Sequence, residues 1–509
     1  MEISETLPLT SSSPLPATAK PTGTLAFLAA HPSAFGFGAA VLVLTSVLAV
    51  YARAAGPPAL PKYSYPEQVF TVLGADPNTQ LTVSWAVSSS DGASMAGAFP
   101  RVAYGLGASS TALPLSAPAS CTWYSTTPDQ TFEYAAYTSP LLCSATITIP
   151  SSSPGTVVRY VAGDDIHGFS SVRATATAPI PGTPGVRLAV LGDLGTTANS
   201  TSTLASILAS HANAPFASAL LVGDLSYADG SQPVWDEWGR LVDPLASTLP
   251  MWTAVGNHDW FDTIAAPCDY KTPPYCSYTF TAFTARTHNP TATLPATADT
   301  LFFSVNLGLL HIVVLQAYCT NMTATSTQPC LAAGSAQAEW LKGDLASVKR
   351  EVTPWVVVAF HQPFVNSNKA HPMNTEGAPI RAALEEVLFS GGVDLVLSGH
   401  VHAYERSCRV HNLECTGNAT GPVYITIGDG GNRELLATSW LDPQPSWSLV
   451  RSATYGHGEV TAVNASHLHW VWNNNPDLLP REMDQVWLVK GEAGQVGGGE
   501  TLQPKLRSR

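Results

Sequence analysis

Charged residues are scarce in this chain. They make up 12% of its 509 residues, and 24 Lys and Arg stand against 37 Asp and Glu, for a formal net charge of −13. Proteins that bind nucleic acid usually carry a basic face, so the composition argues against a nucleic-acid partner. It does not exclude an anionic small molecule, because bound metal ions can dominate the local field of a site even in an acidic protein.

The sequence also lacks internal repeats and C-x-x-C zinc patterns. Its eight cysteines are instead near neighbours along the chain: Cys121 and Cys143, Cys268 and Cys276, Cys319 and Cys330, Cys408 and Cys415. We interpret them as four local disulfides formed in an oxidising compartment, with buried free thiols as the alternative. The N-x-S/T sequons also favour a secretory route, and they predict N-glycans at Asn199, Asn321, Asn418 and Asn464.

The N-terminal segment agrees with a secretory route. Residues 1–32 are rich in Ser, Thr and Pro and are predicted to be disordered. Residues 33–51 carry no charge and approach the roughly 20 residues that span a bilayer. A small-x-small sequence follows at Ala52-Arg53-Ala54, so residues 33–54 are predicted to be a signal peptide or an uncleaved signal anchor, with a buried core helix as the alternative. The protein would then be secreted, vacuolar or membrane-anchored.

Two folded regions are expected after a stiff linker at 55–62. Residues 63–180 contain short alternating runs separated by Gly, Pro, Ser and Asp, which predicts a small antiparallel β-sandwich with Trp85 in its core. From 184 to 490, longer apolar runs alternate with segments expected to be helical, which predicts an α/β domain. The expected helices include Thr203–His211, Ser335–Arg350 and Ala378–Phe389. The Gly-rich tail at 491–509 is predicted to be flexible. We assign the first region a structural role, because no chemistry-bearing motif lies in it.

Polar side chains follow five predicted strands of the α/β region, at the point where each strand ends. They are Asp193 in LAVLGDLG, Asp224 in ALLVGDLSY, Asn257 and His258 in TAVGNHD, His361 in VVVAFH, and His400 and His402 in LVLSGHVH. A single Asp or His at such a position is usually a turn or cap residue. Ligand sites in open α/β sheets form outside the carboxyl ends of strands, so we expect these residues to meet at one edge of one sheet.

The types of these residues select the chemistry. The Asp, Asn and His side chains of this set offer oxygen and imidazole donors, which suit borderline first-row metal ions. They are too many for one tetrahedral zinc, and calcium prefers an all-oxygen shell. Two ions that share one carboxylate fit better, and such pairs stabilise both oxygens of an in-line displacement at phosphorus. The sequence therefore predicts a two-metal phosphoesterase.

The blocks GDLG, GDLSY, GNHD, AFH and GHVHAYERS, in that order, resemble the metal-binding blocks of the purple acid phosphatases. Most of these blocks occur throughout the metallophosphoesterase superfamily, and Tyr227 is the specific element. IGDGGNRE at 427–434 and YGHG at 455–458 are similar to the large plant-type members. The resemblance runs from about Tyr65 to Lys490 and implies an α/β/β/α sandwich preceded by an all-β, fibronectin-III-like sandwich.

The resemblance also implies a ligand set and two substrate-facing residues. Fe(III) would be bound by Asp193, Tyr227 and His402. A divalent ion, which is Zn, Mn or Fe, would be bound by Asn257, His361 and His400, and Asp224 would bridge the two ions. His258 would face the substrate phosphate and protonate or stabilise the leaving group. His371 matches the second residue of a histidine pair in plant-type members, with Ala370 in place of the first, and would bind phosphate.

The predicted activity is acid hydrolysis of phosphate monoesters by metal-bound hydroxide. A phosphodiesterase, nucleotide pyrophosphatase or phytase on the same metal site is the alternative, because the loops of the pocket decide between these substrates. A surface glycoprotein without activity is a more distant alternative, and its sign would be a lost ligand. The oligomeric state stays open, with a homodimer as one option.

Overall fold

The computed structural model describes residues 66–87, 99–126, 135–150, 155–259, 280–290, 301–318, 330–417, 420–475 and 481–490. These described residues belong to one compact unit. The predictions for the tail 1–32, the apolar segment 33–54, the linker and the tail 491–509 fall outside the described residues. Within the described ranges, no helix is long and apolar enough to cross a membrane.

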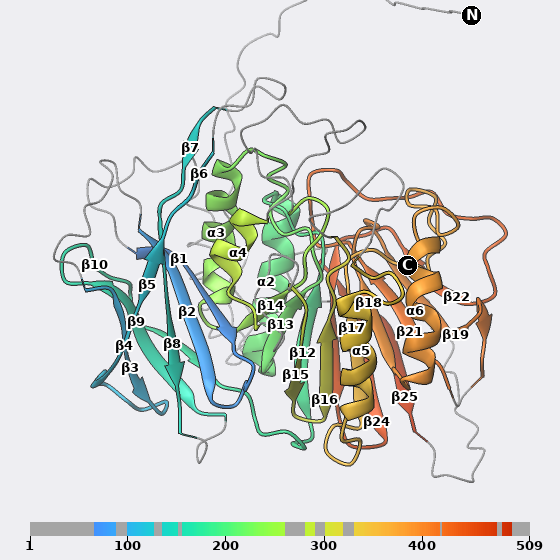
Figure 1. Cartoon of the computed structure of the whole chain (residues 1–509), viewed down its shortest axis with the longest axis horizontal. Coiled ribbons are helices and arrows are strands. Elements are labelled where there is room, and N and C mark those ends of the chain that lie inside the picture. Colours follow the sequence, from blue (N-terminus) through green and yellow to red (C-terminus); the bar gives the residue numbers. More distant parts are fainter. Residues whose placement is uncertain are drawn as a thin grey trace, which may run out of the picture. The chain divides into compact units, whose positions relative to one another are not determined.

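The N-terminal region is a β-sandwich, as predicted (Figure 1). One sheet has the order β1-β2-β8-β5, formed by Pro66–Leu73, Gln80–Val87, Leu141–Thr148 and Ser120–Thr122. The other has the order β10-β9-β3-β4, with β11 also paired to β9; these strands are Gly168–Phe169, Val157–Asp164, Arg101–Leu106, Leu115–Pro118 and Arg173–Ala176. Two short strands, β6 (Ser125–Thr126) and β7 (Tyr137–Thr138), pair antiparallel with each other. Trp85 is buried in the core of this region, as the sequence predicts.

Two of the predicted disulfides lie in the described residues. Cys121–Cys143 links the neighbouring strands β5 and β8, and Cys408–Cys415 closes a hairpin in the C-terminal half. Cys330 also takes part in a disulfide. The remaining predicted members lie outside the described residues: Cys268, Cys276 and Cys319.

The sandwich is joined to the rest of the unit through β1. The backbone N–H of Val69 donates to Asp243 on helix α3 (Pro233–Ala246) at 2.9 Å. The Thr71 hydroxyl donates to the Ala246 carbonyl at 2.6 Å, where the same helix ends. The indole of Trp252, on β14 (Met251–Thr253), donates to the Leu73 carbonyl at 2.9 Å. These bonds support the strand that leads to Asn257 and His258, which fits the structural role assigned to the region.

The C-terminal region contains two sheets, one on each side of the site. The six-stranded sheet has the order β14-β13-β12-β23-β24-β25, in which the last five strands are Ser218–Leu221, Val186–Leu191, Gly456–Ala462, His467–Asn474 and Arg481–Val489. The eight-stranded sheet has the order β15-β16-β17-β18-β21-β19-β20, with β22 paired to β19; its strands are Phe303–Leu307, Leu310–Val314, Trp355–Ala359, Leu395–Ser398, Val423–Ile427, Tyr404–His411, Glu414–Cys415 and Ser448–Ser452. The expectation of one sheet is therefore wrong, because β12, β13 and β14 belong to one parallel set and β17 and β18 to another.

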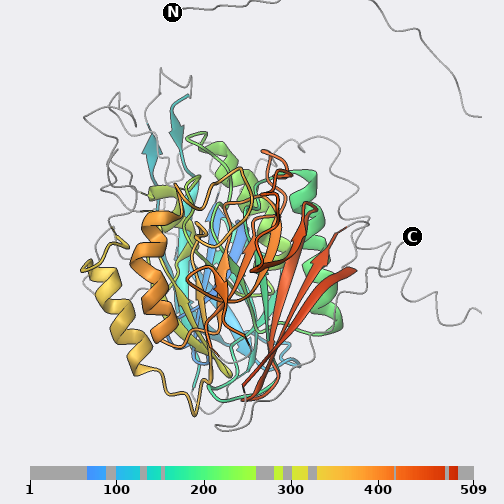
Figure 2. The ribbon, with the colours of Figure 1, turned by 90° about the vertical axis from the view of Figure 1, so that its right-hand side faces the viewer.

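Helices cover the outer faces of the two sheets. Figure 2 shows α5 (Ala336–Ser347) and α6 (Ala378–Ser390) on one side of the strands and α2 (Ala198–Asn213) on the other. Central strands such as β16 and β17 are consequently buried along their whole length, as expected for parallel strands covered on both faces. This arrangement is the predicted α/β/β/α sandwich.

Helix boundaries differ from prediction where capping decides them. The expected helix at Thr203–His211 begins at Ala198, because the Thr197 side chain accepts from the N–H groups of Asn199 and Ser200, and the Ser200 hydroxyl oxygen in return accepts from the Thr197 N–H. Helices α3 and α4 (Thr281–Thr287) were not predicted. Pro at the first turn of α3 is a start signal that sequence patterns do carry.

Candidate metal centre

The predicted site residues follow the strands closely. Asp193 lies two residues after β12, Asp224 three after β13, and His361 two after β17. Asn257 and His258 follow β14, and His400 and His402 follow β18. The carboxyl ends of two parallel sets of strands therefore deliver these side chains to one place between the two sheets.

Several of these residues adopt a left-handed backbone that non-glycine residues rarely take. The φ angles are 55° at Asp193, 53° at Asp224, 57° at Tyr227 and 69° at His400. Such conformations cost about 1–3 kcal/mol each and gather at functional sites, where they aim a side chain that ordinary backbone could not. Gly256 matters for a different reason. A Cβ at this position would lie 2.0 Å from Asp224 Oδ1, so a larger residue would collide with the Asp224 carboxylate.

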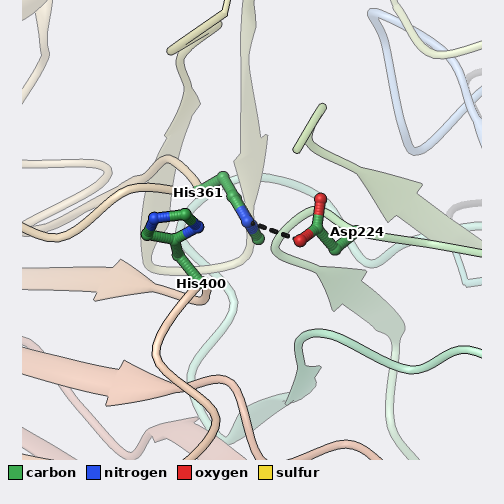
Figure 3. Close-up of side chains that lie close together, drawn as sticks. All are labelled: Asp224, His361 and His400. Atoms are coloured by element: carbon green, nitrogen blue, oxygen red, sulfur yellow. Dashed lines mark ion pairs between the residues drawn. The ribbon is translucent and has the colours of Figure 1, made fainter. Parts of the chain in front are cut away.

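Asp224, His361 and His400 form the buried centre of the site (Figure 3). Asp224 Oδ2 and His361 Nε2 lie 3.0 Å apart, yet neither atom makes a hydrogen bond among the described residues. The other ring nitrogen of His361 contacts the Val222 carbonyl at 2.9 Å, which fixes the ring. Two buried polar atoms without hydrogen bonds are costly unless a further group binds them, and a cation fits this pair of donors.

Asp193, Tyr227 and His402 form a second cluster beside the first. The Tyr227 hydroxyl lies 3.0 Å from Asp193 Oδ1 and 3.0 Å from His402 Nε2, and the tyrosine is buried. The other nitrogen of His402 contacts the Leu435 carbonyl at 3.1 Å. The ring is thus held with Nε2 toward the phenol and the carboxylate, as a metal-binding histidine is usually held by an outer hydrogen bond.

Asn257 is linked to the cluster of Asp224, His361 and His400 through a residue that the sequence did not suggest. The Tyr318 hydroxyl donates to Asn257 Oδ1 at 3.3 Å, and the Tyr318 ring lies 6.0 Å from His361 and 6.5 Å from His400, between ring centroids. All seven predicted metal ligands therefore lie in one region, six of them buried and Asn257 half-buried. No motif marks Tyr318 in the sequence, because its place depends on packing between the two sheets.

His258 is held at the rim by a carboxylate. Its Nδ1 lies 2.6 Å from Asp229 Oδ1, and its backbone N–H donates to Asp224 Oδ1 at 2.8 Å. The Tyr227 ring stacks on the imidazole at 4.3 Å between centroids. Glu434 Oε1 lies 3.7 Å from the free nitrogen, Nε2. Asp229 stands two residues after Tyr227 in GDLSYAD, a signal that sequence analysis could have used.

His371 lies beside the buried centre on the segment that precedes α6. Its ring centroid is 3.8 Å from that of His400. Glu376 Oε2 lies 3.0 Å from His371 Nδ1 and 3.3 Å from His400 Nε2, so one carboxylate orients both rings. The nitrogen of His371 that remains, Nε2, is the one available to a ligand. The role of Glu376 was not foreseen, since its distance from His400 in sequence hides the contact.

The electrostatics of the site favour positive charge. Burial opposes protonation of His361, but the carboxylates of Asp224 and Asp193 outweigh it and raise its pKa to about 9. Burial likewise opposes protonation of His258, and Asp224 and Asp229 raise its pKa to about 10. Burial lowers the pKa of His400 to about 4, which keeps that imidazole in the neutral form that binds metals.

Asp259 supports the loop that carries Asp224. Its carboxylate is buried and accepts three backbone N–H groups: those of Asp224 at 2.9 Å, Leu225 at 2.8 Å and Gly256 at 2.9 Å. These bonds tie the exit of β13 to the exit of β14. Asp259 thus holds two predicted ligand segments together without facing the centre itself.

Asp259→Ala is expected to destabilise the protein. The substitution leaves three buried N–H groups without acceptors, and each such group costs about 1–3 kcal/mol, so the free energy of unfolding should fall by about 3 kcal/mol. Denaturant unfolding of the metal-free protein measures this change. Asp259→Asn keeps the volume and one acceptor oxygen and should give an intermediate value. An alanine variant within about 0.5 kcal/mol of wild type would show that these bonds are replaced by water.

The fold and the site define a calcineurin-like phosphoesterase, and the sequence profile of that family matches residues 186–404. A second profile, described as iron/zinc purple acid phosphatase-like protein C, matches residues 421–478. The chain belongs to the purple acid phosphatase family. Arabidopsis thaliana "Probable purple acid phosphatase 20" is 39% identical over 343 residues, which are 67% of this chain and 73% of that protein.

Other relatives agree. "Purple acid phosphatase 1" of Ipomoea batatas is 35% identical over 374 residues, covering 70% of this chain and 73% of that protein. Among solved structures, purple acid phosphatase PPD1 from yellow lupin seeds aligns with a TM-score of 0.68 at 20% identity, over 84% of this chain and 75% of its own, and supports the fold. The chain is therefore a phosphatase of a family with a binuclear metal centre, which confirms the predicted class.

Proposed function

We propose that this chain is an acid phosphatase that hydrolyses phosphate monoesters with one Fe(III) ion and one divalent ion, which is Zn, Mn or Fe. Fe(III) would be held by Asp193, Tyr227 and His402, the divalent ion by Asn257, His361 and His400, and Asp224 would bridge the two. The observation that carries this proposal is the pair of buried donor atoms, Asp224 Oδ2 and His361 Nε2, that face each other without hydrogen bonds.

The donor set fits two unlike ions. The cluster around Tyr227 offers a carboxylate and a phenol, whereas the cluster around His361 offers two imidazoles and an amide. Anionic oxygen donors favour the more highly charged ion, and imidazole suits a divalent first-row ion. When bound, two such ions supply Lewis-acid stabilisation of the phosphoryl oxygens and lower the pKa of water.

The residues around the ions divide the remaining work. His258 presents Nε2 at the rim and is oriented by Asp229, so it is placed to hold a proton for the leaving oxygen of the ester. His371 is oriented by Glu376 through Nδ1, which leaves Nε2 for a phosphoryl oxygen. Ala370 is exposed, with its backbone N–H bonded to Asn368, so His371 would act without a histidine partner.

Substrate class is tested by comparing turnover of a phosphate monoester, a phosphate diester and phytate by the same metal-loaded protein. We expect the monoester to be hydrolysed with the highest kcat/KM at acid pH. Preference for the diester would instead favour a phosphodiesterase, and preference for phytate would favour a phytase. If the metal-loaded protein hydrolysed none of the three substrates, the assignment as an acid phosphatase would be contradicted.

The remaining features of the proposal concern the setting of the enzyme. We propose that the protein enters the secretory pathway and is secreted, delivered to the vacuole, or anchored in a membrane through residues 33–51. Residues 63–180 and 184–490 would form its two domains. Glycans would attach at the predicted sequons, of which Asn464 is exposed and Asn199 half-buried at the start of α2.

A further inference from the structure

The segment from Tyr227 to Asp229 holds two site residues in an unfavourable backbone. The φ angle is 57° at Tyr227 and 47° at Asp229, and neither residue is a glycine. Both conformations are needed at once: the first aims the phenol at Asp193 and His402, and the second aims the carboxylate at His258. Such a segment persists only where the surrounding structure holds it in place.

Arg433 contacts this segment at both of its strained residues. One guanidinium nitrogen donates to the Tyr227 carbonyl, and another donates to Asp229 Oδ2. Asp229 uses its other oxygen, Oδ1, for His258 at 2.6 Å. Arg433, about 200 residues away in the sequence, thus contacts both the backbone of Tyr227 and the Asp229 carboxylate that orients His258.

The base of Arg433 is itself fixed to the site. Arg433 directly follows the sequence IGDGGN, which resembles plant-type relatives. None of the predicted metal ligands lies in that sequence. Asn432 donates from its backbone N–H and from its side-chain amide to the Asp193 carbonyl, at 3.1 and 3.2 Å. Gly430 passes so close that a Cβ on it would lie 2.1 Å from the Gly192 carbonyl. The block therefore closes over the Asp193 turn and presents Arg433 from a rigid support.

We propose that Arg433 is a positioning residue that holds Tyr227 and Asp229, and through Asp229 holds His258, in their working places. The inference rests on the proposed function, because its consequences appear in the iron–tyrosinate pair and in proton donation to the leaving group. Arginine suits this task because its planar fork donates in two fixed directions, whereas a lysine offers one compact charge that cannot reach both acceptors in the same way.

If Arg433 only stabilised the fold, its loss would lower the free energy of unfolding and leave Tyr227 and His258 unchanged. The Arg433 side chain is 50% exposed and that of Asp229 is 28% exposed. Exposed ion pairs add little to the free energy of unfolding, so loss of Arg433 should barely change stability. A positioning role instead predicts changes at Tyr227 and His258 without loss of the fold.

The test compares the variants Arg433→Ala and Arg433→Lys in iron-loaded protein. We expect Arg433→Ala to shift or weaken the visible absorption band of the tyrosinate. We also expect turnover of an alkyl phosphate to fall by about 10²-fold, and turnover of 4-nitrophenyl phosphate to fall several times less, because only the alkyl leaving group needs a proton. Arg433→Lys should have a turnover between those of the wild type and Arg433→Ala. Added guanidinium should restore part of the activity of Arg433→Ala.

Arg101→Ala is the matched control, since Arg101 makes a two-pronged exposed pair with Asp165 in the β-sandwich. It should change neither the band nor the ratio of the two substrates. If both Arg433 variants keep the wild-type band and the wild-type ratio, the proposal is overturned. A raised KM for both esters with an unchanged band would also overturn it, because Arg433 would then bind phosphate directly. Wild-type protein without a visible band would instead overturn the iron–tyrosinate part of the proposed function.

Discussion

Asp224→Asn should lower turnover of phosphate monoesters by about 10³-fold or more, because stabilisation by two metal ions is worth several kcal/mol in the transition state. The substitution keeps the volume of the side chain but removes the charge that would bridge the ions. Asp224 is buried, and its Oδ2 faces His361 Nε2 at 3.0 Å. Metal analysis of the purified variant, beside its kinetics, should show less than two ions per chain.

Asp344→Asn is the matched control for this loss of charge. Asp344 on α5 accepts from the Ser304 hydroxyl at 2.7 Å and contacts His311 Nε2 at 2.9 Å, away from the strand exits. This variant should keep both ions and full turnover. Near-normal activity and metal content in Asp224→Asn would contradict the assignment of Asp224 as the bridge.

His258→Gln should separate good from poor leaving groups. A positioned proton donor contributes about 10²–10⁴-fold when the leaving oxygen needs a proton. Turnover of an alkyl phosphate should therefore fall by about 10²-fold or more, while 4-nitrophenyl phosphate should lose much less. Steady-state kinetics on both esters measure the ratio, and metal content should stay unchanged because His258 is not among the predicted ligands.

His311→Gln provides the comparison for His258→Gln, since His311 is also a buried histidine paired with a carboxylate. It should leave the ratio of the two esters as in wild type. An equal loss on both esters in His258→Gln would contradict proton donation and would favour a role in binding the phosphoryl group.

The sequence predicts where most of the candidate site residues lie because they follow a buried strand within a few residues. Asp193, Asp224 and His361 could be predicted because each is a polar residue close to the end of an apolar run. The N-terminal sandwich was predictable for a similar reason, since strand β9 alternates half-buried and buried positions over most of its length. Local patterns therefore give the elements and the donors.

What the sequence does not predict are contacts between segments that are far apart along the chain. The division into two sheets depends on which parallel strands pair, and the apolar runs of β12 and β17 look alike. Tyr318 and Glu376 reach the site through packing and loop geometry rather than through a motif. Arg433 stands in a recognisable block, yet its partners are known only once the β21–β22 segment closes over Tyr227.

The central claim, a binuclear site with Fe(III) bound by Tyr227, is tested most directly by metal analysis together with the visible spectrum of wild-type protein and Tyr227→Phe. The phenol lies buried between Asp193 and His402, at 3.0 Å from each. We predict iron and a second metal ion in the wild type, and a visible band that is lost in Tyr227→Phe. Iron-loaded wild-type protein without such a band, or a band that persists in Tyr227→Phe, would contradict the account.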